Sequence, residues 1–160
     1  TPKREYVIGE THKYLGRKYI LKIEKSDENK VNIKGSFIVV KTQNDSSENV
    51  KHLLTEWYYK RASKIFEKVY NDALKKFNQY KIQKPEMQIK RMKKRWGSYT
   101  SSGNITINPE LIKASSGCIE YVFIHELCHL IERNHSKKFY YLLEQIAPDW
   151  KHWKLKLEKM

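Results

Sequence analysis

The stretch from Val50 to Phe77 constrains the fold more than any other part of this 160-residue chain. Its apolar side chains recur three and four positions apart, which predicts an amphipathic helix of about eight turns and about 45 Å. Asp45 followed by Glu48 has the pattern of a capping box, so we expect the helix to occupy residues 45–80. The apolar stripe is broad and aromatic, which favours packing across a sheet over the alternative of a dimeric coiled coil.

Strand patterns lie on both sides of this helix. β-Branched and aromatic residues alternate or cluster in short segments, with turn-forming residues between them. The predicted strands are Tyr19–Ile23, Val31–Ile33, Phe37–Val40, Met87–Trp96 and Ile105–Ile107. In the fourth segment the apolar face changes partway, which predicts a bulge near Lys90. The residues from Gly97 to Gly103 are expected to form a turn.

Helical patterns return after these strands, over residues 117–133, over residues 136–146, and in a short segment opened by Pro148. Strands, a long helix, more strands and then helices indicate the α+β class. A chain of this length has room for one core, so we expect a single domain over residues 1–160. Its parts are a strand-rich segment 1–44, the long helix 45–80 and a catalytic part 85–160.

The sequence His125-Glu126-Leu127-Cys128-His129 is an H-E-x-x-H pattern, which on a helix is typical of zinc-dependent proteases. Histidines four positions apart lie about 40° apart around a helix and about 6 Å apart along it, so both reach one ion. Glu126 points beside that ion, where a carboxylate can act as general base towards water. Two histidines and a glutamate in so apolar a helix are costly unless a divalent ion satisfies them. Core histidines bonded to the backbone are the alternative.

A catalytic zinc site takes three protein ligands and keeps one position open. His135, six positions after His129, is the candidate third ligand. A continuous helix would turn His135 away from the metal, so we expect the helix to end between Glu132 and Asn134. Less favoured ligands are Glu144 and His152, and the expected surface histidines are His12 and His52.

Further motifs surround the H-E-x-x-H pattern. They are Arg95-Trp96-Gly97-Ser98, Gly103, Asn108-Pro109-Glu110-Leu111, Tyr121-Val122, His135-Ser136, Phe139, Pro148 and Trp150. Together they resemble the YgjP-like metal-dependent hydrolases, which are similar to the SprT and WLM groups of minimal zincins, and the match covers most of the chain. The resemblance implies a small zincin-like fold with a twisted, mostly antiparallel sheet, a long backing helix and a buried active-site helix.

The same resemblance implies a Zn²⁺ cofactor held by His125, His129 and His135, with Glu126 as the catalytic base. SprT and WLM members act on DNA-associated proteins, so by analogy it also implies substrates near nucleic acid.

The chain is strongly basic, with 32 Lys and Arg against 18 Asp and Glu and a formal net charge of +14. Such an excess attracts anions, among them nucleic acid, acidic proteins and membrane surfaces. Between Lys81 and Arg95 the basic side chains are accompanied by a single acid, Glu86. This strip predicts non-specific contacts to DNA phosphates, and a solvated strand edge is the alternative.

No apolar run approaches the roughly 18–20 residues that span a bilayer, and no signal peptide is visible, so we expect no membrane contact. Cys118 and Cys128 share one predicted helix at a separation of about 15 Å, which is too far for a disulfide. This cysteine usage fits the cytoplasm. The oligomeric state is left open.

These features predict a zinc metallopeptidase that hydrolyses peptide bonds, with Glu126 transferring the proton. An edge strand near a Met87–Ile107 hairpin is expected to align the substrate. Candidates for stabilising the oxyanion are Arg95, Tyr140 and Tyr141. The alternative is a basic nucleic-acid-binding module with a structural zinc site closed by Cys128, in which a general base would have no use.

Overall fold

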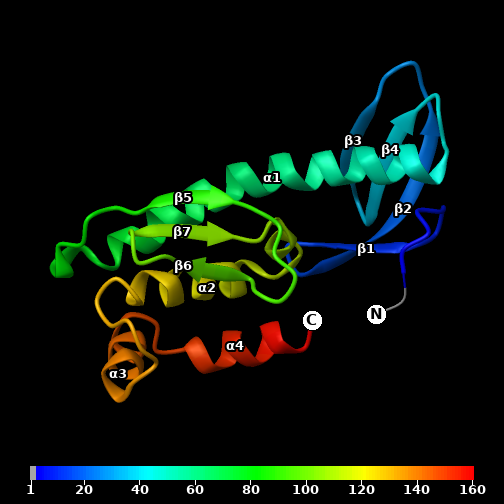
Figure 1. Ribbon diagram of the computed structural model, residues 1–160. Helices are drawn as coiled ribbons and strands as arrows, with labels where there is room; N and C mark the ends of the chain where they lie inside the picture. The colour runs from blue at the N-terminus through cyan, green and yellow to red at the C-terminus, as the bar shows by residue number, and fades with distance from the viewer. Residues whose placement is uncertain (1–2) are drawn as a thin grey trace.

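The computed structural model describes residues 3–160, which contain four α-helices and two small sheets (Figure 1). The first sheet has the strand order β1-β2-β4-β3. Its central pair, β2 and β4, is parallel, and the two outer pairs are antiparallel. Its strands are β1 (Thr11–Tyr14), β2 (Arg17–Lys25), β3 (Lys30–Lys34) and β4 (Phe37–Thr42).

The second sheet has the order β5-β7-β6, so β6 lies at one edge. β5 pairs with β7 in parallel, and β6 pairs with β7 in an antiparallel hairpin. The side chains of Ile105 and Ile107 on β7 are fully buried, as suits the central strand. The strands are β5 (Glu86–Ile89), β6 (Gly97–Tyr99) and β7 (Asn104–Ile107).

Helix α1 (Ser47–Lys75) runs along both sheets and joins them (Figure 1). Near its start, Val50 and Leu54 are buried in a small core with strands β2 and β4. Farther along, the ring of Phe66 packs edge-on against Phe123, with centroids 5.9 Å apart. Burying an apolar side chain of this size contributes about 1.5–3 kcal/mol, so the long stripe is satisfied by contact with two different cores.

Helix α2 (Ser116–Cys128) lies at the centre of the larger core, between the second sheet and the C-terminal helices (Figure 1). Helices α3 (Lys137–Ile146) and α4 (Trp150–Glu158) pack on it. A Cβ atom added to Gly117 of α2 would lie 2.4 Å from the Trp153 ring of α4, so only glycine permits this close approach. Two short 3₁₀ helices, η1 (Asn78–Tyr80) and η2 (Pro109–Lys113), complete the described elements.

The α+β class, the long helix and the buried central helix are confirmed, whereas the single expected sheet is divided in two. The long helix is also shorter than residues 45–80. Ser46 is its N-cap in place of Asp45, because the Ser46 hydroxyl accepts a hydrogen bond from the Asn49 amide at 3.3 Å.

The expected strand Met87–Trp96 is wrong beyond Ile89. The following residues form a loop because the Asn108 side chain donates to the carbonyls of Met92, at 2.8 Å, and Arg95, at 3.0 Å. The strand ends near Lys90 where we expected it to bulge. Gly97 to Tyr99, expected to turn, is strand β6, and the hairpin is therefore β6–β7 rather than Met87–Ile107.

Within residues 3–160, no helix combines the length and the apolar character that crossing a membrane requires.

Candidate active site

The end of α2 determines where the third histidine can go. His129 is the C-cap residue, and the amides of Leu130 and Ile131 bond three residues back, at 3.0 and 3.1 Å. These bonds tighten the last turn, after which the chain leaves the helix and returns towards it. The expected end between Glu132 and Asn134 is wrong, because the helix stops at Cys128. The interruption that His135 needs is nevertheless present.

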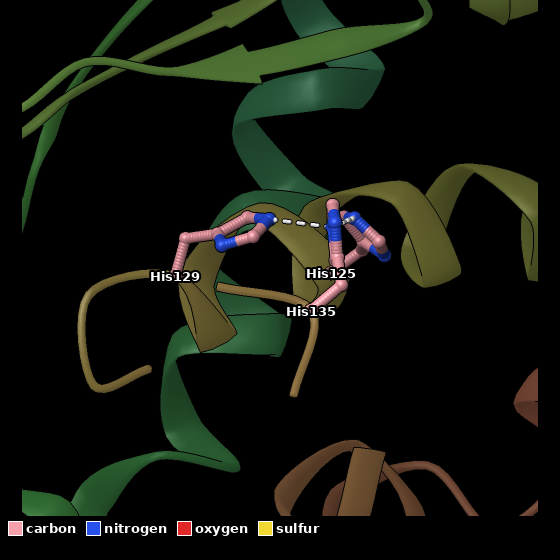
Figure 2. A group of neighbouring side chains, drawn as sticks. All are labelled: His125, His129 and His135. Atoms are coloured by element: carbon pink, nitrogen blue, oxygen red, sulfur yellow. Dashed lines mark hydrogen bonds between the residues drawn. The ribbon is translucent and has the colours of Figure 1, made fainter. Parts of the chain in front are cut away.

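Three imidazoles converge beside this turn (Figure 2). The Nε2 atom of His135 lies 3.2 Å from that of His125 and 3.0 Å from that of His129. One nitrogen from each ring lies within 4.8 Å of the others. Two nitrogens bound to one tetrahedral ion at 2.0–2.1 Å are about 3.3 Å apart. The three donors therefore fit a single divalent metal ion, and the exposed position of His135 keeps one side accessible.

Hydrogen bonds orient one of these rings. The Nδ1 atom of His129 donates to the carbonyls of Glu132, at 3.2 Å, and Arg133, at 2.9 Å. This assignment of the proton leaves Nε2 with a free lone pair directed at the metal position. The same bonds hold the loop that carries His135. The contacts of His129 therefore orient its own ring and also position the His135 ring beside it.

The ring of Phe139 in α3 packs against all three histidine rings of the cluster. Its fully buried ring lies 5.0 Å from the His125 ring, 4.6 Å from the His129 ring and 4.9 Å from the His135 ring, measured between centroids. Burial, together with repulsion from the other two imidazoles, lowers the pKa of His125 to about 4. A neutral imidazole is the form that binds metal.

Glu126 lies beside the cluster and is not one of the converging donors. It lines a cavity of about 270 Å³ together with His125 and Arg95. Burial raises the pKa of Glu126 to about 7, and the positive charge of Arg95 acts in the opposite direction. A carboxyl group with a pKa near neutrality can both accept and return a proton.

Gly97 brings strand β6 onto this glutamate. A Cβ atom at Gly97 would lie 2.9 Å from Cγ1 of Val122 and 3.2 Å from Cγ of Glu126. Two positions along, the Tyr99 ring stacks on the His129 ring, with centroids 6.2 Å apart. The edge strand therefore lies directly over helix α2, beside the histidine cluster.

Comparison with protein families matches residues 1–160 to the YgjP-like metallopeptidase domain. The chain belongs to the YgjP-like metallopeptidase family. It is therefore a metal-dependent peptidase, and the family implies a divalent metal in the site.

Solved structures show the same fold. The zymogen of abylysin from Pyrococcus abyssi is 21% identical with a TM-score of 0.53, over 59% of this chain and 92% of its own. The zymogen of jannalysin from Methanocaldococcus jannaschii is 22% identical with a TM-score of 0.52, over 59% of this chain and 88% of its own. Both are metallopeptidases by name. No curated protein matches the chain.

The less favoured ligands lie outside the cluster of this YgjP-like chain. The Glu144 carboxylate accepts a hydrogen bond from the indole of Trp150 at 2.6 Å, and the His152 ring packs on Trp153. Cys128 is buried and belongs to no described group of potential metal ligands. His52 is exposed, as expected.

The surface assignment of His12 is wrong. Its side chain is buried, and its Nε2 atom lies 2.8 Å from a carboxylate oxygen of Glu10. Glu10 lies two positions earlier in an extended segment, and residues so spaced share one face. The spacing of Glu10 and His12 in the sequence thus allowed this contact to be predicted, but it gave no sign that His12 is buried.

Of the three candidates for oxyanion stabilisation, Arg95 lines the cavity that holds Glu126. Tyr140 packs near His135, with ring centroids 6.3 Å apart, whereas Tyr141 is 70% exposed and lies in another pocket. Tyr121 belongs to one of the motifs of the resemblance but is not among the predicted site residues. This tyrosine lines the same cavity and precedes His125 by one helical turn, which was the available signal.

Proposed function

We propose that this metallopeptidase uses Zn²⁺ held by the Nε2 atoms of His125, His129 and His135, with Glu126 as general base. The convergence of the three nitrogens carries the proposal. Three neutral nitrogen donors with an open fourth position are the pattern of catalytic zinc sites. When bound, such an ion supplies Lewis acidity, which polarises a peptide carbonyl and makes water more acidic.

Glu126 supplies the proton transfers. Its carboxylate faces the cavity shared with His125, so it can accept a proton from the attacking water and deliver it to the departing amine. Close packing of Gly97 against Glu126 restricts the carboxylate to this position. Arg95, in the same cavity, is the candidate group for stabilising negative charge on the carbonyl oxygen.

Strand β6 is the proposed guide for the substrate backbone. Asn108 N donates to Trp96 O at 2.9 Å, and Thr100 N donates to Asn104 O at 2.9 Å. Hydrogen-bonded pairs alternate along an antiparallel ladder, so the backbone groups of Gly97 and Tyr99 point away from β7. A polypeptide can pair with this free edge while its scissile bond lies beside Glu126.

The alternative, a nucleic-acid-binding module with a structural zinc, is less well supported. A structural site closes with a fourth protein ligand, and Cys128 lies outside the histidine cluster. Substrates associated with nucleic acid stay a prediction, which rests on analogy with the SprT and WLM groups. Free Cys118 and Cys128 suit a reducing compartment, and we propose the cytoplasm.

Incubation with a mixed peptide library, read by mass spectrometry, tests the proposal. We expect cleavage that a chelator abolishes and that added Zn²⁺ restores. Cleavage that persists in the metal-free protein would contradict the proposal.

A further inference from the structure

A basic cleft lies next to the catalytic cavity. It has a volume of about 520 Å³ and shares Arg95 and Trp96 with the cavity that holds Glu126. The cations that line it come from the N-terminal segment, β1, the loop before β6, and η2. They are Arg4, Lys13, Lys93, Lys94, Arg95 and Lys113. Among the described residues, Glu110 is the one acid in its lining.

Glu110 offsets only a small part of the positive charge in the cleft. Its carboxylate is bound by Arg91 at 2.6 Å and by Lys113 at 2.5 Å. Within residues 3–160, no salt bridge involves the other five cations of the lining, which are Arg4, Lys13, Lys93, Lys94 and Arg95. The cleft therefore presents a concentration of unpaired positive charge.

The loop that carries three of these cations is held in a fixed shape. Asn108, whose side chain is buried, donates from Nδ2 to the carbonyls of Met92 and Arg95. Its backbone amide also bonds Trp96 O at 2.9 Å. A loop ordered in advance loses little conformational entropy when a ligand binds, which favours a binding role for this segment.

The cleft lies at one end of the proposed substrate guide. The basic loop directly precedes Gly97, the first residue of β6. A polypeptide paired with the free edge of β6 would therefore leave the strand at its Gly97 end and enter the cleft. At the Tyr99 end, the chain turns through Thr100 to Gly103 and enters β7.

The chemistry of the lining favours acidic side chains over nucleic acid as the occupant. Single-stranded nucleic acid is bound by basic grooves with exposed aromatic rings on which bases stack. The indole in this lining, Trp96, is partly buried and packs against the core, and His12 is buried. The described lining of the cleft thus holds six cations and a single, partly buried indole, which favours binding by charge over binding by base stacking.

We propose that this cleft binds acidic residues of the substrate polypeptide, on the side of the scissile bond beyond the Gly97 end of β6. This inference rests on the proposed catalytic role of the neighbouring cavity. It assigns a substrate class, polypeptides with an acidic segment flanking the cleavage site on one side. The specificity comes from charge complementarity, which also accelerates encounter with such substrates.

The test uses labelled peptides of equal length and the Glu126→Gln protein, which retains the cleft. One set carries four Glu residues before a common central segment, a second carries them after it, and matched sets carry Gln or Lys. Fluorescence anisotropy measures their affinity. We expect Glu peptides of one orientation to bind about tenfold more tightly than their Gln counterparts, since two or three partly sheltered ion pairs form. Raising the salt concentration should remove the difference.

A double variant, Lys93→Glu with Lys94→Glu, should abolish the preference. Its matched control is Lys64→Glu with Lys68→Glu, which makes the same change of charge at exposed positions of α1 and should retain the preference. Equal affinity for Glu and Gln peptides would overturn the proposal, as would an equal effect of both double variants. Oligothymidylate that binds the cleft more tightly than the Glu peptides would assign it to nucleic acid instead.

Cleavage assays with the wild-type protein separate this inference from the proposed function. Glu126-dependent cleavage with no dependence on flanking charge would overturn the cleft assignment alone. Charge-dependent binding in the cleft, combined with cleavage that does not require Glu126, would overturn the proposed mechanism alone.

Discussion

The position of His135 depends on residues outside its own segment. The helix stops at Cys128, and His129 Nδ1 then donates to the carbonyls of Glu132 and Arg133, which directs the loop back to α2. The spacing from His129 to His135 indicated that a stop was needed. Its location depends on tertiary contacts, such as those of Phe139, that a local pattern does not contain.

Replacing His135 with Ala should weaken zinc binding by several kcal/mol, because one of three ligands is lost from sites whose apparent binding free energies reach about 10–16 kcal/mol. Competition with a chromophoric chelator measures the change. His152→Ala, which alters a histidine outside the cluster, is the control and should bind zinc normally. Undiminished zinc affinity in the His135 variant would transfer the ligand role to another residue.

The elements were predictable where a pattern is local and repeated. α1 was identified because its apolar stripe recurs through most of a 29-residue helix, and α2 because it is apolar on nearly all sides. The second sheet was less predictable. Asn108, from a distant position in the sequence, holds Met92 and Arg95 in a loop outside the sheet. Gly97 lies in strand β6, and it is glycine because the strand approaches α2 closely there. Glycine in such a segment looks like a turn when the partner helix is unknown.

Contact between α2 and α4 yields a prediction at this scale. Gly117→Ala would place a methyl group 2.4 Å from the Trp153 ring, so α4 must shift or the backbone must move. We expect a loss of about 1–3 kcal/mol in the free energy of unfolding, measured by urea denaturation. Ser116→Ala, at the exposed neighbouring position, should change stability little. Equal stability of the two variants would show that α4 does not pack as described.

The whole molecule combines two cores along one helix with an excess of positive charge. α1 contacts both sheets, and a cavity and a basic cleft lie side by side at the second sheet. The net charge is evident in the sequence, in which the Lys81–Arg95 strip predicts a contact with DNA. Only the fold groups part of that strip with Arg4, Lys13 and Lys113 in one cleft.

At this scale we predict weak, sequence-independent DNA binding that reflects the total charge of +14. The dissociation constant should be about 10⁻⁴ to 10⁻⁶ M at physiological salt and should rise steeply with ionic strength, because counterions are released on binding. Gel shifts across a salt series measure it. The cleft and α1 double variants should weaken this binding to similar extents. No shift at low salt would show that the charge serves only to solvate the surface.

The most direct test of the central claim is a paired measurement on Glu126→Gln. The amide is nearly the same size but cannot accept a proton, so zinc content should stay near one ion per chain. The rate of chelator-sensitive peptide cleavage should fall by about 10²–10⁴. Cleavage by this variant at the wild-type rate, with zinc bound, would contradict the assignment of Glu126 as general base and the mechanism built on it.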